Sequence, residues 1–455
     1  MLTKVNIVIL AAGKGTRMQS LTPKVLHCLA GKPLLQHVIE AAKALSPSKM
    51  IVIYGYGGDA VPNAFTQKDL IWVEQKEQLG TGHAVLQASP KLDDDGTTLI
   101  LLGDVPLLNA SSCLALLNKT KSIGLLTVNK ENPTGYGRVI RDAQGHIVSI
   151  VEHKDATEAQ KKVTEVNTGI IAVNNGKLKK WLSQLSNDNA QGEYYLTDII
   201  AMAVNEGLSV EAEVTHDESS VAGVNSKADL AGLERVYQLA YATKLMEAGA
   251  TIADPFRIDV RGELTVGKDV EIDVGCVFEG HVILADQVKI GPYCVIKDSV
   301  IGRATTVAAF THIDQAKVAA DCKLGPYARL RPGAELADSA HVGNFVEIKN
   351  SQIGVNSKVN HLSYVGDATI GQNVNIGAGT ITCNYDGVNK YRTVIEDNVF
   401  IGSDTQLVAP VVIGEGATIA AGSTITKNAP AGQLTFCRAK DQKSIPNWKR
   451  PVKNN

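Results

Sequence analysis

The sequence predicts two domains of different class, a mostly parallel α/β domain followed by a parallel β-helix. The chain has 455 residues, which exceeds the ~250–300 residues that one hydrophobic core sustains. Up to about residue 225, short aliphatic runs alternate with amphipathic stretches, as in α/β domains. Beyond residue 250, aliphatic residues recur every six positions, as in a β-helix. We therefore expect domains at 1–225 and 249–455, joined by a linker helix over 226–248.

The composition is that of an ordinary folded protein, with 44% hydrophobic and 20% charged residues. With 45 basic and 47 acidic residues, the net charge of −2 gives no general attraction to nucleic acid or to an anionic membrane. The longest apolar stretch, 99–117, is interrupted by Asp104 and Pro106, which would be costly in a membrane span. We expect no nucleic-acid partner and no membrane insertion.

The seven cysteines are scattered, odd in number and free of CxxC spacing, so neither a disulfide framework nor a zinc site is indicated. The first apolar run, 5–12, lacks a charged leader and runs straight into Lys14 and Arg17, unlike a secretory signal. A reducing, cytoplasmic location is the simplest expectation.

In the first domain, the aliphatic runs 5–10, 50–53 and 99–102 are expected strands, with a helix near 34–45. Ligands of such sheets bind at the carboxyl ends of the strands. The expected helix over 226–248 carries one apolar stripe, formed by Leu230, Leu233, Tyr237, Tyr241 and Leu245. It fits a connector, although a last helix packed only on its own domain would give the same pattern.

The second half carries three apolar registers with a period of six. They are Val266, Ile272, Phe278, Leu284, Ile290 and Ile296; then Leu324, Leu330, Leu336, Val342 and Ile348; then Ile401, Leu407, Ile413, Ile419 and Ile425. Stacked coils would bury these columns, with about eighteen residues in each coil. The registers slip near 300, 318, 353 and 383–396, and we expect loops to leave the β-helix there.

A glycine-containing turn, 10–18, follows the first expected strand. Gly13 and Gly15 would let backbone N–H groups approach a phosphate, and Arg17 and Lys24 add positive charge. The turn does not match a P-loop, and taken alone it is more often an ordinary strand-to-helix turn. Asp104 ends the buried run 99–104, where a carboxylate can hold Mg²⁺ against phosphates, although a turn or helix-capping aspartate is the alternative.

Several further motifs, taken in order, match a known family. They are LAAGKGTRM with Pro23-Lys24, Gln75 with Gln78-Leu79-Gly80-Thr81, Gly103-Asp104, 133–138, 152–155, 166–169 and Gly223-Val224-Asn225. In this order they resemble the bacterial bifunctional UDP-N-acetylglucosamine pyrophosphorylase/glucosamine-1-phosphate N-acetyltransferase. The resemblance covers nearly the whole chain. It implies a Rossmann-like nucleotidyltransferase domain, a left-handed β-helix of hexapeptide repeats and a homotrimer.

The resemblance also implies a site for UTP and the nucleotide sugar. Its residues would be Leu10, Ala11, Ala12, Gly13, Lys24, Gln75, Gly80, Thr81, Leu102, Gly103, Asp104, Gly137, Glu152, Asn167 and Asn225. Asp104 and Asn225 would hold Mg²⁺, and Arg17 and Lys24 would neutralise charge during catalysis. Relatives often have Tyr where this chain has Leu102, which puts any contact of that phenol in doubt.

A second polar cluster lies in the expected β-helix. Arg331 and Lys349 are eighteen residues apart, so they should stack in adjacent coils and grip a phosphate, although a solvated ladder of charges is the alternative. His361 is the candidate general base, and the alternative is that it has a structural role. We expect a structural role for His27, His37 and His83. The resemblance implies that Arg331, Lys349, Tyr364 and Asn375 bind glucosamine 1-phosphate. It implies that Ala378, Asn384, Tyr385, Ser403, Ala421 and Arg438 bind acetyl-CoA.

The expected function is therefore synthesis of UDP-N-acetylglucosamine for peptidoglycan and lipopolysaccharide. Acetyl-CoA would acetylate glucosamine 1-phosphate, and UTP would then uridylylate the product with release of pyrophosphate. One alternative is a nucleotidyltransferase for another sugar with a regulatory β-helix. Another is a non-catalytic scaffold of the same architecture, which predicts loss of Lys24, Asp104, Asn225 and His361, all of which are present.

Overall fold

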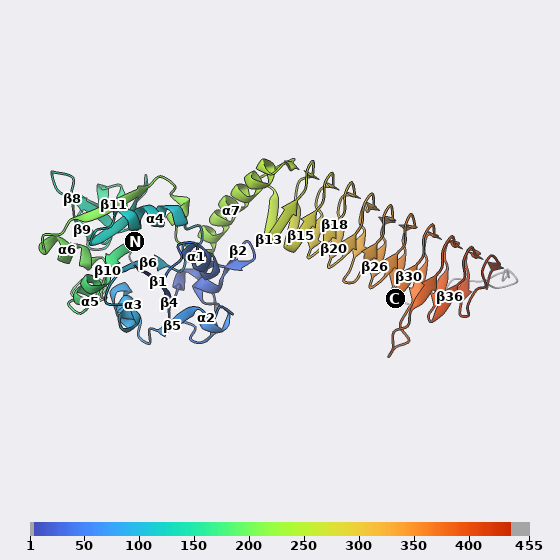
Figure 1. The fold of residues 1–455 in the computed structure, drawn as a ribbon, viewed down its shortest axis with the longest axis horizontal. Coiled ribbons are helices and arrows are strands. Elements are labelled where there is room, and N and C mark those ends of the chain that lie inside the picture. The colour runs from blue at the N-terminus through green and yellow to red at the C-terminus, as the bar shows by residue number, and fades with distance from the viewer. Residues whose placement is uncertain (1–3, 438–455) are drawn as a thin grey trace, which may run out of the picture. The chain divides into compact units, whose positions relative to one another are not determined.

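The computed structural model describes residues 4–437, which form two compact units that divide between Tyr237 and Gln238. The first unit is an α/β domain and the second is a β-helix (Figure 1). This is the fold class expected from the sequence. The division lies inside helix α7 (Lys227–Glu247), at the place where the sequence predicts a helix over 226–248.

The first unit is built on one central sheet of strand order β11-β7-β10-β6-β1-β4-β5. Only β10 in this order runs antiparallel to its neighbours. A hairpin, β8 and β9, extends the sheet beside β10, and β2 and β3 form a separate pair. The strands are β1 (Val5–Ala11), β2 (Cys28–Leu29), β3 (Lys32–Pro33), β4 (Lys49–Tyr54), β5 (Leu70–Glu74), β6 (Thr97–Leu102), β7 (Ile123–Asn129), β8 (Arg138–Arg141), β9 (Ile147–Val151), β10 (Glu165–Asn174) and β11 (Val210–Thr215).

Helices cover both faces of this sheet because alternate strand residues point to opposite sides. Ile7 and Ile9 of β1 belong to the core that includes Val38 of α1 and Leu116 of α4, whereas Val8 belongs to the core with Trp181 of α5. The helices are α1 (Leu34–Lys43), α2 (Ala60–Asn63), α3 (Thr81–Ala88), α4 (Ala110–Lys119), α5 (Asn175–Leu182) and α6 (Asp198–Asn205), with 3-10 turns η1 (Thr16–Met18), η2 (Lys24–Leu26), η3 (Ser89–Lys91), η4 (Gln160–Lys162) and η5 (Ser219–Val221).

Helix α7 contributes to the cores of both units. In its first half, Leu233 is buried in a cluster with Met18 and Val224 of the α/β domain. In its second half, Ala242 and Leu245 join the core of the β-helix. A helix packed only on its own domain, the alternative left open by the sequence, is therefore wrong.

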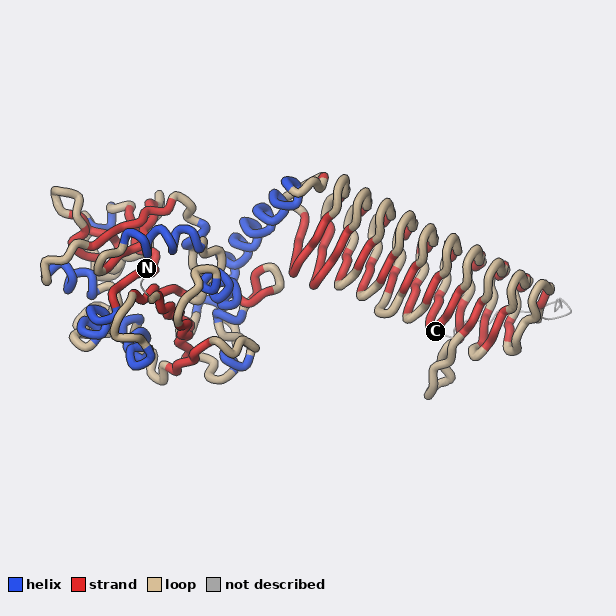
Figure 2. Tube along the Cα trace, viewed as in Figure 1, coloured by secondary structure: helices blue, strands red, loops and turns tan. Residues whose placement is uncertain are grey.

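The β-helix has three faces of short parallel strands, stacked coil upon coil (Figure 2). Face A contains β12 (Thr251–Ile252), β14 (Glu271–Ile272), β16 (Lys289–Ile290), β19 (Thr306–Val307), β22 (Lys323–Leu324), β25 (His341–Asn344), β28 (Lys358–His361), β31 (Asn375–Ile376), β34 (Phe400–Ile401), β37 (Thr418–Ile419) and β39 (Leu434–Thr435). Face B contains β17 (Val295–Lys297), β20 (His312–Asp314), β23 (Arg329–Leu330), β26 (Glu347–Lys349), β29 (Tyr364–Gly366), β32 (Ile381–Cys383), β35 (Gln406–Val408) and β38 (Thr424–Ile425).

Face C follows face B in every coil. It contains β18 (Val300–Ile301), β21 (Lys317–Val318), β24 (Glu335–Leu336), β27 (Gln352–Ile353), β30 (Ala368–Ile370), β33 (Thr393–Ile395) and β36 (Val411–Ile413). In the first two coils, the long strands β13 (Ile258–Val266) and β15 (Cys276–Leu284) continue from face B into face C. All three predicted apolar registers point into one core, and among the residues of these registers only Val266 is partly rather than fully buried.

The expectation of loops at the register slips is correct for one slip and wrong for three. Paired residues of adjacent coils are 18 apart at Leu330 and Ile348, but 17 apart at Ile313 and Leu330. Near 300, 318 and 353 the chain turns from face B to face C one residue sooner, with Asp298, Gln315 or Asn350 at positive φ. These slips are shortened corners. At the fourth slip, residues 384–392 between β32 and β33 leave the stack, as the projecting tan loop in Figure 2.

Candidate functional sites

The first site lies at the carboxyl ends of β1 and β6, which pair in parallel with Leu10 opposite Leu102. The Gly103 N–H donates to the Leu10 carbonyl over 2.9 Å, so the phosphate-loop candidate and Asp104 leave the sheet side by side. This arrangement follows from the topology, because parallel neighbouring strands end at the same edge.

Four predicted charged or polar residues converge there. Lys24 forms an ion pair with Asp104, and both side chains are largely buried. The Lys24 Nζ also lies 3.4 Å from Asn225 Oδ1, and Arg17 Nη2 donates to the same oxygen over 2.9 Å. The Val224 N–H donates to the Asp104 carbonyl over 2.9 Å, which joins the Asn225 segment to the end of β6. Two cations thus face one carboxylate and one amide oxygen.

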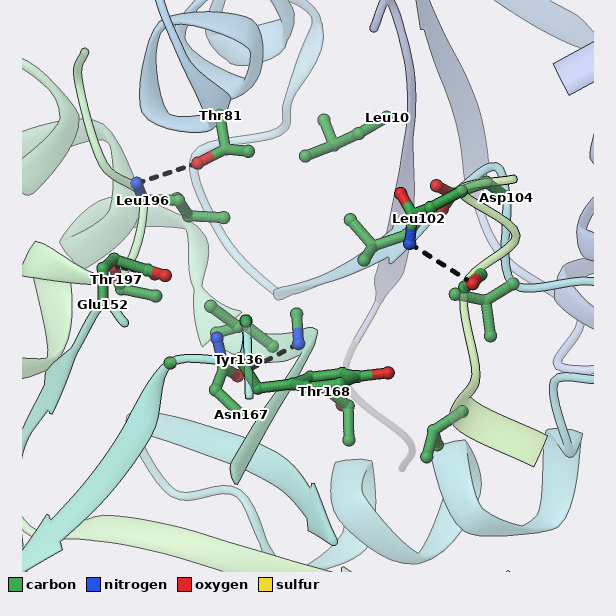
Figure 3. A pocket seen from close by; sticks show the side chains of 18 residues that line it. Leu10, Thr81, Leu102, Asp104, Tyr136, Glu152, Asn167, Thr168, Leu196 and Thr197 are labelled. Atoms are coloured by element: carbon green, nitrogen blue, oxygen red, sulfur yellow. Dashed lines mark hydrogen bonds between the residues drawn. The ribbon is translucent and has the colours of Figure 1, made fainter. Parts of the chain in front are cut away.

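Two cavities adjoin this cluster, with volumes of about 250 and 450 Å³. They share Leu10, Thr81, Leu102 and Asp104, and Figure 3 shows Thr81 and Asp104 on opposite sides of the smaller one. Between them they are lined by fourteen of the predicted nucleotide-sugar residues, namely Leu10, Ala11, Ala12, Gly13, Lys24, Gln75, Gly80, Thr81, Leu102, Asp104, Gly137, Glu152, Asn167 and Asn225. Arg17 and Gly103 lie beside the cavities and line neither.

The larger cavity contains Gln75, Gly80 and Thr81, three of the residues that the resemblance assigns to UTP and the nucleotide sugar. Gln75 is buried, and its side-chain amide donates to the Gly80 carbonyl over 3.2 Å. Gly80 has a φ of 111°, and a Cβ there would lie 2.7 Å from the Tyr194 carbonyl, so only glycine fits. The Thr81 hydroxyl accepts a hydrogen bond from the Leu196 N–H over 3.1 Å. Gln75, Gly80 and Thr81 are therefore held in place by the surrounding backbone.

The smaller cavity contains Glu152, which Figure 3 shows beside Thr197. Burial raises the pKa of Glu152, although a hydrogen bond of 3.2 Å from the Thr197 hydroxyl opposes this shift. Asp155 and Asp198 add negative charge nearby and raise that pKa further. Thr197 was missed from the sequence, because no motif connects it to Glu152, 45 positions away.

Leu102 lines both cavities. Its side chain packs against the apolar core below β1 and β6. A leucine offers no hydroxyl to a ligand, so at this position only its backbone can form a hydrogen bond.

The second site lies on face B of the β-helix. Arg329 and Leu330 pair with Glu347 and Ile348, so Arg331 and Lys349 follow at matching positions of adjacent coils, as the spacing of eighteen predicts. Arg331 Nη1 donates to Glu347 Oε1 over 2.8 Å.

Tyr364 belongs to the next coil of the same face. Its hydroxyl lies against Gly366, where any Cβ would collide with it, and Gly366 pairs with Lys349. The tyrosine hydroxyl therefore lies in the column of the two predicted cations.

A third cation reaches this column from the projecting loop. The Lys390 ammonium lies against Lys349, and together with Arg331 it holds the pKa of Lys349 below its usual value. Asp367 stands beside them and accepts hydrogen bonds from the side-chain amides of Asn350 and Asn384. Burial acts to raise the pKa of Asp367, but these amides and the two lysines lower it. Arg331 is paired with Glu347, and Lys349 and Lys390 lie beside Asp367, so three cations face two carboxylates. One positive charge is left that an anion can neutralise.

Lys390 was missed from the sequence. It belongs to no hexapeptide register, and only the path of the 384–392 loop brings it to Lys349. The one sequence feature that pointed to this loop was the long register slip at 383–396, which lies within a polar cluster.

His361 lies at the corner between faces A and B, with its ring exposed to solvent. Its Nδ1 is 2.8 Å from Oδ1 of Asn344, which pairs with His361 from the adjacent coil. Because an amide oxygen only accepts, the Nδ1–H donates to it, and the lone pair is left on Nε2. Asn344 thus selects the tautomer in which Nε2 can act as a base.

The predicted acetyl-CoA residues do not all gather in one place. Strand register puts Ala378, Ser403 and Ala421 in one column with His361, at the A/B corner. Asn384 is buried against Asp367 at the B/C corner, and Tyr385 is exposed in the projecting loop. Asn375 lies on face A in the column of Lys358. Arg438 lies outside the described residues.

Within residues 4–437, no group of three or more His, Cys, Asp and Glu side chains is arranged to hold a metal ion. No helix among these residues combines the length and apolarity that a membrane crossing requires. The seven cysteine thiols are all free.

Comparison with known proteins gives matches in both units. Residues 7–160 match the MobA-like NTP transferase domain, and residues 392–427 match the bacterial transferase hexapeptide repeats. The chain is 66% identical to the Bifunctional protein GlmU of Methylobacillus flagellatus, with 99% of this chain and 98% of that protein covered. It is 59% identical to the Bifunctional protein GlmU of Janthinobacterium sp., covering 98% and 99% of the two chains.

The chain belongs to the GlmU family. A GlmU protein of Nitrosospira multiformis is 55% identical, with 99% of each chain covered. Membership of the GlmU family confirms the resemblance named from the sequence. It also confirms the expectation of a bifunctional transferase with nucleotidyltransferase and acetyltransferase activities. Two sites on two separate cores agree with two activities.

Proposed function

We propose that this chain acetylates glucosamine 1-phosphate on its β-helix and uridylylates the product in its α/β domain, which yields UDP-N-acetylglucosamine. The observation that supports the proposal is the presence of two clusters of cationic side chains on separate cores. One is the Arg17, Lys24, Asp104 and Asn225 cluster beside two cavities. The other is the Arg331, Lys349 and Lys390 column near His361.

In the α/β domain, an oxygen of the sugar 1-phosphate would attack the α-phosphorus of UTP, and pyrophosphate would leave. The reaction needs orientation and charge neutralisation more than covalent chemistry from the protein. Lys24 and Arg17 would neutralise phosphate charge, while Gln75, Gly80 and Thr81 would hold the base. Glu152 would accept hydrogen bonds from sugar hydroxyls, and the burial that raises its pKa also holds it inside the cavity.

Asp104 and Asn225 fit a magnesium site. Their oxygens are the kind of ligand that Mg²⁺ prefers, and Mg²⁺ usually takes only one or two protein ligands beside phosphate oxygens and water. The Lys24 ammonium contacts both side chains, so this pair of oxygens already accommodates a positive charge. When bound, Mg²⁺ would supply neutralisation of the triphosphate charge.

In the β-helix, Arg331, Lys349 and Lys390 would hold the phosphate of glucosamine 1-phosphate. The sugar amine would attack the thioester carbonyl of acetyl-CoA, forming a C–N bond while the C–S bond breaks. His361 Nε2 would accept the amine proton, because Asn344 keeps the other ring proton on Nδ1. The coenzyme A thiolate is the leaving group.

We further propose a cytoplasmic homotrimer in which a second chain completes the acetyl-CoA site. Two observations support it. Asn375 lies on face A, away from the column of Arg331 and Lys349 on face B. A ladder of stacked aromatic rings, formed by Tyr293, Phe310, Tyr327 and Phe345, is about half exposed along the A/B corner. In the next coil its column continues to Leu362, the neighbour of His361. Large exposed apolar surfaces of this kind mark association sites.

A coupled assay tests the function. The protein is incubated with glucosamine 1-phosphate, acetyl-CoA, UTP and Mg²⁺, and UDP-N-acetylglucosamine and free thiol are measured. Omitting acetyl-CoA should abolish the product, and N-acetylglucosamine 1-phosphate should restore it. Equal use of ATP or dTTP would favour a nucleotidyltransferase for another sugar, and the absence of both activities would favour a scaffold.

A further inference from the structure

Asn225 is held by two different parts of the α/β domain. Its side-chain oxygen faces Arg17 and Lys24 in the nucleotide site. Its backbone N–H points the other way and donates to Oδ2 of Asp229 over 3.0 Å. Asp229 lies in the first turn of α7 and is exposed to solvent.

The same Asp229 oxygen also accepts the Ser226 N–H over 2.9 Å, while the Asp229 N–H donates to the Ser226 hydroxyl over 3.1 Å. Such a reciprocal pair is a capping box that begins a helix. Here it does more than begin the helix, because one of the two N–H groups belongs to Asn225, which precedes the box. On the other side of Asn225, Val224 is buried with Met18 and Leu233.

From this geometry we propose that Asp229 is a positioning residue for the metal and nucleotide site. It fixes the backbone of Asn225 so that the side-chain oxygen stays directed toward Lys24, whose ammonium also contacts Asp104. The proposal rests on the proposed function, because it takes Asn225 as a ligand of the Mg²⁺–UTP complex. Groups that orient a metal ligand through hydrogen bonds typically change metal affinity or activity by ~10–100-fold when they are removed.

An ordinary helix cap is the competing explanation, and the chain offers matched variants that separate the two. Asp229→Ala removes the acceptor of the Asn225 N–H. Asp229→Asn keeps an acceptor oxygen but removes the charge. Ser226→Ala removes the other half of the capping box and leaves the bond between Asn225 and Asp229 in place.

The direct measurement is Mn²⁺ binding to the full-length protein with UTP and without sugar phosphate, followed by electron paramagnetic resonance. Asp229→Ala should weaken Mn²⁺ binding by at least ~10-fold. Asp229→Asn and Ser226→Ala should stay close to the unaltered protein. In the uridylyl-transfer assay, Asp229→Ala should need a correspondingly higher Mg²⁺ concentration for half-maximal rate, while acetyl transfer is unchanged.

Unaltered Mn²⁺ binding by Asp229→Ala would overturn the proposal. An equal loss in Asp229→Asn would also overturn it, because charge rather than the hydrogen bond would then be responsible, and an equal loss in Ser226→Ala would assign the effect to capping. Failure of the proposed function gives a different result, because the unaltered protein would then transfer no uridylyl group while its Mn²⁺ binding could still be compared with that of the variants.

Discussion

The hydrogen bond between Asn344 and His361 leads to a quantitative prediction for acetyl transfer. Asn344 is the partner of the His361 ring, at 2.8 Å, and it directs the lone pair to Nε2. Asn344→Ala removes this single neutral hydrogen bond, which is worth about 0.5–1.5 kcal/mol. At 1.36 kcal/mol per tenfold, the acetyl-transfer kcat should fall by about 2- to 13-fold. His361→Ala removes the base itself and should lower kcat by ~10²–10⁴-fold.

The charge of the partner gives a second readout from the same position. Asn344→Asp would place a carboxylate against the imidazole and favour its protonated form. The limb of the pH–rate profile that reports the base should therefore move to higher pH, with uridylyl transfer unchanged at every pH. The assay is thiol release from acetyl-CoA between pH 5.5 and 9, with the trimer content of each variant measured in parallel.

Two results would refute this reasoning. An Asn344→Asp profile that coincides with that of the unaltered protein would mean that His361 is not the base in the rate-limiting step. A near-normal kcat in His361→Ala would return this histidine to a structural role. Because His361 is exposed, its replacement should leave the thermal midpoint almost unchanged, which separates chemistry from folding.

Further predictions concern other parts of the chain. Asp104→Asn should abolish uridylyl transfer and leave acetyl transfer nearly intact; equal loss of both activities in the folded variant would contradict two separate sites. Burial raises the pKa of Glu152 in the folded protein above the value of about 4.3 in the unfolded chain. Its contribution to folding stability is therefore fully present below a pH of about 4.3 and is lost as the pH rises through the pKa of the folded protein. Glu152→Gln should therefore gain thermal stability over the unaltered protein near pH 7 but not near pH 4, as measured by calorimetry. Light scattering should give the mass of a trimer. Phe310→Asp should lower the measured mass of the protein at micromolar concentration, and Asp tolerates the positive φ of this position better than Phe does. An unchanged mass would exclude the aromatic ladder from the interface between chains. Burial raises the pKa of Cys113 and Cys294 to about 12, so a charged thiol reagent at pH 8 should label the exposed Cys28 and Cys437 in the native protein and spare these two.

The sequence predicts the β-helix well because its signal is repeated. Ile348 lies above Leu330 for the same reason that Leu407 lies below Ile425, and a period of six is visible over many coils. The shortened corners at Asp298, Gln315 and Asn350 were misinterpreted as loops. A single missing residue shifts a register as a loop does, and only the backbone distinguishes them.

In the candidate sites too, residues with a local sequence signal were predicted and residues without one were not. Residues carried by a motif, such as Gly80 or Asp104, were predicted together with their neighbours. Thr197, Asn344 and Lys390 were not, because each acts on a predicted residue across a sequence separation that no local pattern encodes. Strand register explains Asn344, which is seventeen positions before His361 and one coil away. Lys390 depends on the course of an irregular loop, which periodicity does not describe.

The stacked coils also give the second unit a length that increases by a constant step with each coil. Each coil advances the chain by about 4.8 Å, the spacing of neighbouring strands, whatever its outward-facing residues are. The coils between Thr251 and Ala328 carry none of the predicted acetyl-transfer residues, which begin at Arg331. Their number therefore sets how far the acetylating coils stand from the end of α7, in fixed steps. Evolution could change that length by duplicating or losing a whole coil, and the chemistry further along the stack would keep its register.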